Sequence, residues 1–149
     1  MPNAGSLLQL GSPPQVARKI RKAAYACKIQ AERLAAANVP LFAITNFPAQ
    51  MYPVARQRFP FLRLFRDVAV SGYERLVKPD PALFHILLRR NDIAPSRAVF
   101  IDDTLRNVEA ANALDLHGIH FTSPEALERE LRALGLLTEQ GQAPSSGCA

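Results

Sequence analysis

Apolar residues along the chain follow two kinds of spacing. From Gln15 to Asn38 they recur at steps of three and four, which is typical of one face of an amphipathic helix, here with a basic opposite side. Residues 39–45 form a short, continuous apolar run, as expected of a strand that is covered on both faces. The pattern predicts further strands at residues 67–72, 98–102 and 118–121.

Helical patterns separate these strands. Asp80 is predicted to cap a helix that begins at Pro81, and Ser123 to cap a last helix that ends at Gly135. Because strands alternate with helices, the sequence predicts the α/β class, with a Rossmann-like parallel sheet and helices on both of its faces. The remaining helical positions are predicted within residues 49–66 and over 106–114, and Leu83, Phe84, Leu87 and Leu88 are predicted to face the core.

The length and composition suit one globular domain, because the chain has 149 residues and 48% of them are hydrophobic. No apolar stretch approaches the roughly 20 residues of a membrane-spanning helix, and the start lacks the pattern of a secretory signal. Cys27 and Cys148 lie far apart, without the spacing of a metal site or a disulfide framework. We therefore expect a cytoplasmic protein with a loose segment at residues 1–14, a core at 15–137 and a disordered tail at 138–149.

The formal net charge of +5 is concentrated near the start of the chain. Up to Asn38 the sequence has six basic residues and one acidic residue, whereas the rest has twelve of each. Because the chain after Asn38 has balanced charge, it does not indicate a basic surface of the kind that binds nucleic acids or other polyanions. We therefore expect no nucleic-acid partner.

Polar residues follow the predicted strands at the point where each strand ends. In open parallel sheets ligands bind at the carboxyl ends of the strands, so we expect these residues to converge. A hydroxyl, an amide, an ammonium and two carboxylates at one edge suit an anionic ligand that is held together with a divalent cation. The residues are Thr45 and Asn46 after the first strand, Ser71 and Gly72 after the second, Lys78 in the next loop, and Asp102 and Asp103 after the third.

Each of these residues also has a purely structural interpretation. Asp102 or Asp103 could cap the helix that follows, and Lys78 could be a solvated surface lysine. Thr45 and Asn46 could stabilise an ordinary turn. The adjacency of the two carboxylates favours a site, because two acids beside a low-dielectric core repel each other and require a positive charge nearby.

Three motifs, in this order, resemble those of a known family. The stretches "LFAITN", "VKPDPALF" and "VFIDDTLRNVEAANALDLHGIHF" are similar to the second, third and fourth motifs of the haloacid dehalogenase-like (HAD) hydrolase superfamily. The resemblance covers about residues 31–137 and is closest to the subgroup of 2-haloacid dehalogenases and small-molecule phosphatases. A response-regulator receiver combines similar residues, but its acid pair comes first in the chain, whereas here it comes last.

The resemblance implies a role for each polar residue. The substrate would be a small anionic molecule, either a phosphate ester or a haloacid, and the cofactor would be Mg²⁺. Phosphatase chemistry is favoured over dehalogenation, because a metal helps to neutralise a phosphate but is not needed to displace a halide. Thr45 and Asn46 would bind the substrate, and Lys78 and Asp103 would be catalytic. Asp103 would also bind the metal, with Asp102 assisting. Asn107 would hold these metal ligands in place without binding the metal itself.

The nucleophile of the family has no counterpart among these motifs. It is an aspartate that attacks carbon or phosphorus to form an aspartyl ester, which water then hydrolyses. It belongs to a DxD-like motif at the end of an N-terminal strand, whereas the first aspartate here is Asp67 and no DxD occurs. We therefore expect an incomplete core without nucleophile strand or cap domain, as in a truncated or frame-shifted product. Such a chain should have no turnover of its own and should self-associate through its incomplete sheet.

Two other interpretations stay open. The basic helix from Gln15 to Asn38 could belong to a non-catalytic protein that binds an acidic partner or a membrane surface. The acid-poor start could instead be a mitochondrial transit segment, although it has early prolines and little serine. If the family interpretation holds, we expect no membrane partner.

Overall fold

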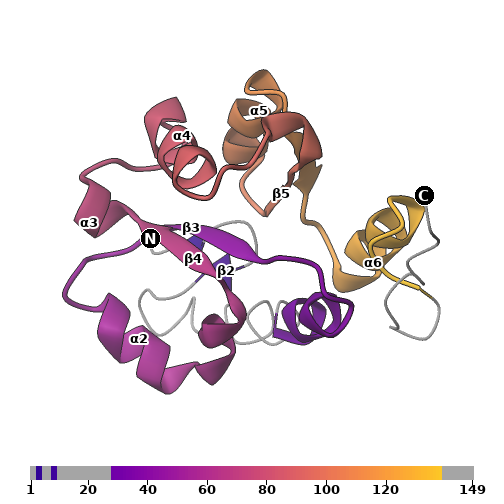
Figure 1. Ribbon diagram of the computed structural model, residues 1–149, viewed down its shortest axis with the longest axis horizontal. Coiled ribbons are helices and arrows are strands. Elements are labelled where there is room, and N and C mark those ends of the chain that lie inside the picture. Colours follow the sequence, from indigo (N-terminus) through magenta and orange to yellow (C-terminus); the bar gives the residue numbers. More distant parts are fainter. Residues whose placement is uncertain (1–2, 5–7, 10–27, 139–149) are drawn as a thin grey trace.

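The computed structural model of the chain describes residues 3–4, 8–9 and 28–138 (Figure 1). The strands are β1 (Asn3–Ala4), β2 (Leu8–Gln9), β3 (Phe42–Asn46), β4 (Asp67–Val70), β5 (Val99–Asp102) and β6 (His117–His120). The helices are helix 28–36, α2 (Tyr52–Arg58), α3 (Ser71–Glu74), α4 (Pro81–Arg90), α5 (Leu105–Ala113) and α6 (Pro124–Ala133), with 3-10 turns η2 (Pro60–Leu64) and η3 (Pro95–Arg97).

Parts of three sequence predictions lie outside the described residues. These parts are most of the loose segment at 1–14, the first half of the helix predicted from Gln15, and the tail beyond residue 138. The described second half of that helix is helical, as predicted. Within the described part of the chain, no helix is long and apolar enough to cross a membrane.

The strands β3 to β6 pair in parallel, as predicted, but they lie in two hydrogen-bonded groups. β3 pairs with β4 in parallel, with Phe42 opposite Asp67, and β5 pairs with β6 in parallel, with Val99 opposite His117. The first group has the order β2-β1-β3-β4 and contains two antiparallel steps, one between β2 and β1 and one between β1 and the last residues of β3. The α/β class is thereby confirmed, while β3 and β5 are not joined by a strand pairing among the described residues.

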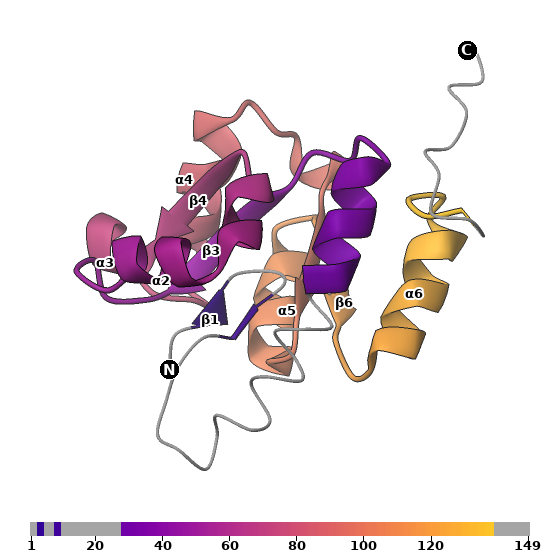
Figure 2. The ribbon, with the colours of Figure 1, turned by 90° about the horizontal axis from the view of Figure 1, so that it is seen from below.

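Helices cover both faces of the strands, and each face has its own apolar core (Figures 1 and 2). Neighbouring residues of a strand alternate between the cores, so Ala43 and Ile101 contribute to one, and Ile44 and Phe100 to the other. The first core is completed by helix 28–36, η2 and α6, and the second by α4 and α5. In the second core lie all four α4 residues that the sequence predicted to face inward, Leu83, Phe84, Leu87 and Leu88.

Local signals set the helix ends. The Asp80 carboxylate accepts a hydrogen bond of 2.9 Å from the Ala82 N–H at the start of α4, and the Ser123 hydroxyl accepts one of 3.1 Å from the Ala126 N–H at the start of α6. Gly135 follows α6 with a φ of 73°, which favours glycine. These caps were predicted from the sequence and are confirmed.

Two strands are shorter than their apolar runs. Val39 does not start β3, because its N–H bonds to the Leu34 carbonyl at 2.9 Å and so completes the end of helix 28–36. The predicted strand 67–72 ends at Val70, because Ser71 is the first residue of α3. In both cases the residue belongs to a neighbouring helix or its end, so its backbone is not available for pairing with a strand.

Candidate functional site

A buried ion pair lies at the carboxyl edge of the strands. The Lys78 Nζ atom is 2.9 Å from Asp102 Oδ2, and both side chains are 0% exposed. Asp102 is the last residue of β5, and Lys78 follows α3 in the chain. Burial lowers the pKa of the Lys78 ammonium, and the carboxylates of Asp102 and Asp103 oppose this shift. The pair therefore connects the two strand groups through charges that water does not screen.

The Asp102 carboxylate is held by further donors. Its Oδ1 atom accepts a hydrogen bond of 2.8 Å from the Thr104 N–H, and its Oδ2 atom accepts one of 3.2 Å from the Asn107 amide. Asn107 is itself buried on α5. The N-cap residue of α5 is Thr104, so neither aspartate occupies the cap position that the structural interpretation assigned to it. Asp102 is instead fixed for its contact with Lys78.

Asn46 holds the backbone of Lys78. Its Oδ1 atom accepts a hydrogen bond of 2.8 Å from the Lys78 N–H, and its Nδ2 atom donates one of 3.4 Å to the Lys78 carbonyl. A side-chain amide can form both bonds at once because it carries a donor and an acceptor side by side. The end of β3 thus determines where the lysine loop lies.

The loop after β3 is fixed against the start of α3. The Ser71 hydroxyl accepts a hydrogen bond of 2.8 Å from the Phe47 N–H, and the Gly72 N–H donates one of 3.0 Å to the Phe47 carbonyl. A Cβ atom at Gly72 would lie 2.3 Å from the Ala49 backbone nitrogen, so only glycine fits this approach. Ser71 and Gly72, predicted at a strand end, support the site through the backbone beside Asn46.

The Thr45 hydroxyl is buried and has no hydrogen-bond partner among the described residues. Thr45 is 2% exposed and immediately precedes Asn46 in β3. A buried polar group without a partner costs on the order of 1–3 kcal/mol, so such groups are uncommon away from functional sites. The hydroxyl is available to a ligand oxygen at this edge.

Asp103 has different surroundings from Asp102. Its side chain is exposed, its Oδ1 atom lies 3.5 Å from the Thr104 hydroxyl, and its backbone carbonyl lies 3.0 Å from His120 Nε2. In the described part of the chain, no three His, Cys, Asp or Glu side chains come together. Mg²⁺ commonly takes only one or two carboxylates and keeps several waters, so the aspartate pair fits a partial site and not a closed cage.

Most of the predicted site residues come together through bonds that the sequence did not reveal. Lys78, Asp102, Asn46 and Asn107 form one hydrogen-bonded group. The sequence analysis did not identify Thr104 as a site residue, although its backbone N–H donates a hydrogen bond to the Asp102 carboxylate. The signal was present, because an aspartate side chain often accepts a hydrogen bond from the backbone two residues later.

The fold and the site define an α/β protein with a charged site at the carboxyl ends of its parallel strands, as in enzymes that bind anionic ligands. The chain belongs to the haloacid dehalogenase-like hydrolase family, which it matches over residues 20–115. This confirms the family to which the three motifs pointed.

Curated relatives include two phosphatases. The chain is 33% identical over 96 residues to the sesquiterpene phosphatase astK of Aspergillus oryzae, which covers 64% of this chain and 49% of the relative. It is 33% identical over 86 residues to the phosphoglycolate phosphatase of Photobacterium profundum, covering 58% of this chain and 38% of the relative. The chain thus spans about half or less of the length of these relatives.

A further relative is acyl-CoA dehydrogenase family member 10 of Mus musculus, with 39% identity over 83 residues, covering 55% of this chain and 7% of the relative. Among solved structures, an uncharacterised protein from Corynebacterium glutamicum has a similar fold, with a TM-score of 0.57 and 22% identity. The match covers 87% of this chain and 90% of that protein. At this identity, the likeness concerns the fold alone.

Proposed function

We propose that this chain carries the anion-binding and charge-neutralising part of a phosphatase site for small phosphate esters. The observation that carries the proposal is the buried Lys78–Asp102 pair at the edge where the Thr45 hydroxyl has no partner among the described residues. A cation and an unused donor at one edge suit a phosphoryl group. Two of the relatives described above bear the name of a phosphatase, which supports a phosphate ester over a haloacid.

The proposed roles follow from the contacts. Thr45 donates its hydroxyl hydrogen to a phosphoryl oxygen, which gives this buried group a partner. Lys78 offsets the negative charge of the bound group, while Asp102 and Asn107 keep the lysine in place. Asn46 acts in substrate binding chiefly by holding the Lys78 backbone, since both polar atoms of its side chain are bonded there.

We further propose that Asp103, assisted by Asp102, binds Mg²⁺ weakly. When bound, the ion would help to neutralise a phosphate. The affinity should be low because Asp102 is engaged with Lys78 and the described residues bring no third carboxylate to the pair. We assign no step of a reaction to the ion.

We also propose that the chain by itself has negligible turnover. The family nucleophile is expected in a DxD motif, and the sequence has none. Its first aspartate, Asp67, lies at the amino end of β4, where it bonds to Arg90 at 2.6 Å and to Asn91 at 2.7 Å. This is the opposite edge from Lys78 and Asp102, so Asp67 cannot act there.

The alternative, an interaction protein that uses a basic helix, gains no support from the described residues. In helix 28–36, Lys28 lies 3.9 Å from Glu32, and Arg33 lies 3.0 Å from Glu128 on α6. Both cations therefore have acidic neighbours within the chain. The other basic residues of the predicted helix lie outside the described residues, so this interpretation stays a prediction.

The experiment that tests the proposed function separates binding from turnover. Inorganic phosphate is titrated calorimetrically into the chain and into Thr45→Val, with Ser96→Ala as a control that removes a hydroxyl at the opposite strand edge. We expect Thr45→Val to bind phosphate about fivefold or more weakly, because one hydrogen bond to a charged group is lost, and the control to bind as the parent does. Equal binding by Thr45→Val would refute the assignment.

Turnover is assayed on the same preparations with p-nitrophenyl phosphate and with 2-chloropropionate. We expect no rate above background with either compound. Hydrolysis that persists in Lys78→Ala and Asp103→Ala would show that the site lies elsewhere in the chain.

A further inference from the structure

Exposed apolar residues border the polar edge of the strands. Met51 lies in the connection that follows β3, Tyr73 on α3 directly after β4, and Leu105 at the start of α5, which follows β5. Val77 immediately precedes Lys78. Each of these four residues is more than half exposed, and several such residues around one site are informative where a single one is not.

Three aromatic rings near this edge, those of Phe47, Tyr52 and Tyr73, form a row that we call the aromatic row. The ring centroids of Phe47 and Tyr52 are 6.4 Å apart, and those of Tyr52 and Tyr73 are 6.3 Å apart, both in edge-to-face contact. Phe47 and Tyr52 are partly buried, whereas Tyr73 is 54% exposed. The aromatic row therefore extends from the loop after β3 to the surface of α3.

Backbone contacts hold the aromatic row beside the polar edge. Phe47 directly follows Asn46, and its N–H and carbonyl bond to the first two residues of α3, as described above. Asn46 in turn bonds to the Lys78 backbone, so Val77 also lies close to Asn46. Because Asn46 adjoins Thr45 in β3, the aromatic row and Val77 begin where the polar site ends.

We propose that the aromatic row and Val77 bind the organic group of the phosphate ester, and that this group is apolar, either an alkyl chain or an aromatic ring. The inference rests on the proposed function and names its substrate class. An apolar group beside Asn46 removes exposed ring surface from water, which strengthens binding. A sugar or polyol gains little there, because its hydroxyls need hydrogen-bond partners and the aromatic row offers only those of two tyrosines.

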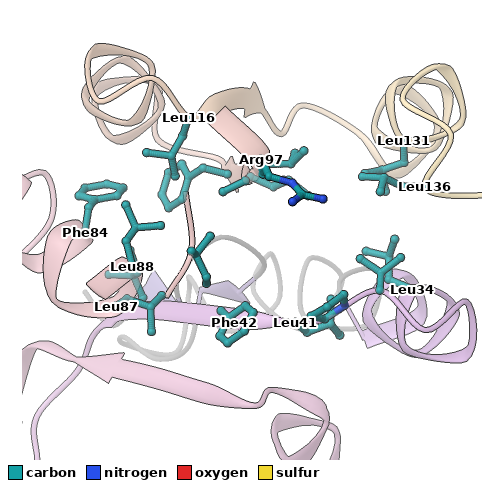
Figure 3. Close-up of a pocket in the computed structure, with 18 residues that line it drawn as sticks. Leu34, Leu41, Phe42, Phe84, Leu87, Leu88, Arg97, Leu116, Leu131 and Leu136 are labelled. Atoms are coloured by element: carbon teal, nitrogen blue, oxygen red, sulfur yellow. The ribbon is translucent and has the colours of Figure 1, made fainter. Parts of the chain in front are cut away.

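The chain has a second apolar surface, a pocket of about 340 Å³ between β3 and β5 (Figure 3). Leu34, Leu87 and Leu131 line it from three different helices. Its lining includes no residue of the aromatic row, and neither Val77 nor Lys78. An apolar group bound in this pocket would therefore not respond to a substitution at Tyr73, which allows an experiment to distinguish the two places.

Binding of three phosphate esters tests the proposal. Hexyl phosphate, glycerol 1-phosphate and methyl phosphate are titrated calorimetrically into the chain, with inorganic phosphate as the reference. We expect hexyl phosphate to bind about tenfold more tightly than methyl phosphate, because a fully buried methylene group strengthens binding about fourfold and those of the hexyl chain are only partly buried. Glycerol 1-phosphate should bind as methyl phosphate does.

Substitutions at exposed positions locate the organic group. Tyr73→Ser and Val77→Ser should each weaken the binding of hexyl phosphate by about threefold or more and leave the binding of inorganic phosphate unchanged. Tyr73→Phe keeps the ring and should bind hexyl phosphate as the parent does. Leu134→Ser removes an exposed apolar side chain after α6, which lies across the molecule from α3 (Figure 1), and should also bind as the parent does.

The outcomes separate this inference from the proposed function. If inorganic phosphate binds and hexyl phosphate binds no more tightly than methyl phosphate or glycerol 1-phosphate, the inference fails while the proposed function stands. If Tyr73→Ser and Val77→Ser keep the full advantage of hexyl phosphate, the organic group lies elsewhere, as in the pocket of Figure 3, and the inference fails as well. If no phosphate compound binds, the proposed function fails and the inference fails with it.

Discussion

Lys78 and Asp102 form an ion pair whose two side chains are fully buried, 24 residues apart in the sequence. Lys78 is placed by its backbone bonds to Asn46 at the end of β3, and Asp102 ends β5. The pair therefore joins two strand groups that no described strand pairing connects. Its contribution to stability depends on both charges being present.

Removal of one partner should destabilise the fold strongly. We expect Lys78→Met or Asp102→Leu to lower the free energy of unfolding by about 3–5 kcal/mol, because each leaves an uncompensated buried charge. The double variant should lose less than the sum of the single variants. Urea denaturation measures all three, with Lys28→Met as a control at the exposed Lys28–Glu32 pair. A loss under about 1 kcal/mol for Lys78→Met would contradict the importance of the buried pair.

Substitution of Gly72 by alanine should disturb the loop after β3. The added Cβ atom would lie 2.3 Å from the Ala49 nitrogen and 2.8 Å from the Phe47 carbonyl, both of which are backbone atoms. We expect a loss of about 2 kcal/mol or more in the free energy of unfolding, since backbone must move to make room. At Gly135 a Cβ atom meets nothing within 4 Å, and only its φ of 73° opposes alanine. Gly135→Ala should therefore cost about 1 kcal/mol, and an equal loss for both variants would argue against the close approach.

The pH dependence of stability should include a contribution from Glu128. Hydrogen bonds from Arg33 and Arg132 lower its pKa from 4.5 to about 2. A carboxylate whose pKa is lower in the folded state stabilises the fold at pH values above 4.5, and this stabilisation disappears as the pH falls toward 2. Glu128→Gln should thus be less stable than the parent at pH 7, by up to about 1 kcal/mol because the group is partly exposed.

Thermal unfolding from pH 7 to pH 2.5 measures this difference. The gap between the parent and Glu128→Gln should narrow below pH 4.5. Glu109→Gln, at an exposed position on the surface of α5, serves as the control and should show no comparable gap. A gap that stays constant over the whole range would mean that the side chain acts through packing and not through its charge.

Magnesium should stabilise the chain slightly through the aspartate pair. An ion that binds only the folded state raises the melting temperature, and at a concentration equal to Kd the gain is about 0.4 kcal/mol. We expect a rise of about 1 °C at roughly 10 mM Mg²⁺ for the parent and none for Asp103→Asn. Asp92→Asn has the same charge change at another exposed position and should respond as the parent does.

Sodium chloride at matched ionic strength is the reference for the magnesium titration. If the parent shows no shift while Asp103→Asn is simply more stable, the aspartate pair is a source of repulsion and not a metal site. The proposed assistance by Asp102 would then fail as well.

The sequence by itself determined the starts of α4 and α6 and the residue types of the site, whereas α3 was predicted as the end of a strand. Asp80 and Ser123 cap their helices through bonds to backbone two or three residues away, so these features depend on neighbours in the chain. The apolar spacing of α4 likewise predicted which residues face the core. The order of strands and polar ends indicated Thr45, Lys78 and the aspartate pair as site residues.

Only the tertiary structure decided how these residues are connected. A lysine after a strand can be solvated or buried, and it is the placement of β5 beside the lysine loop that pairs Lys78 with Asp102. The pairing of strands is also non-local, so the pattern of apolar residues predicted parallel strands but not the separation of β3 from β5. Each strand carries backbone donors and acceptors on both edges, and the three-dimensional arrangement alone determines which edges meet a partner.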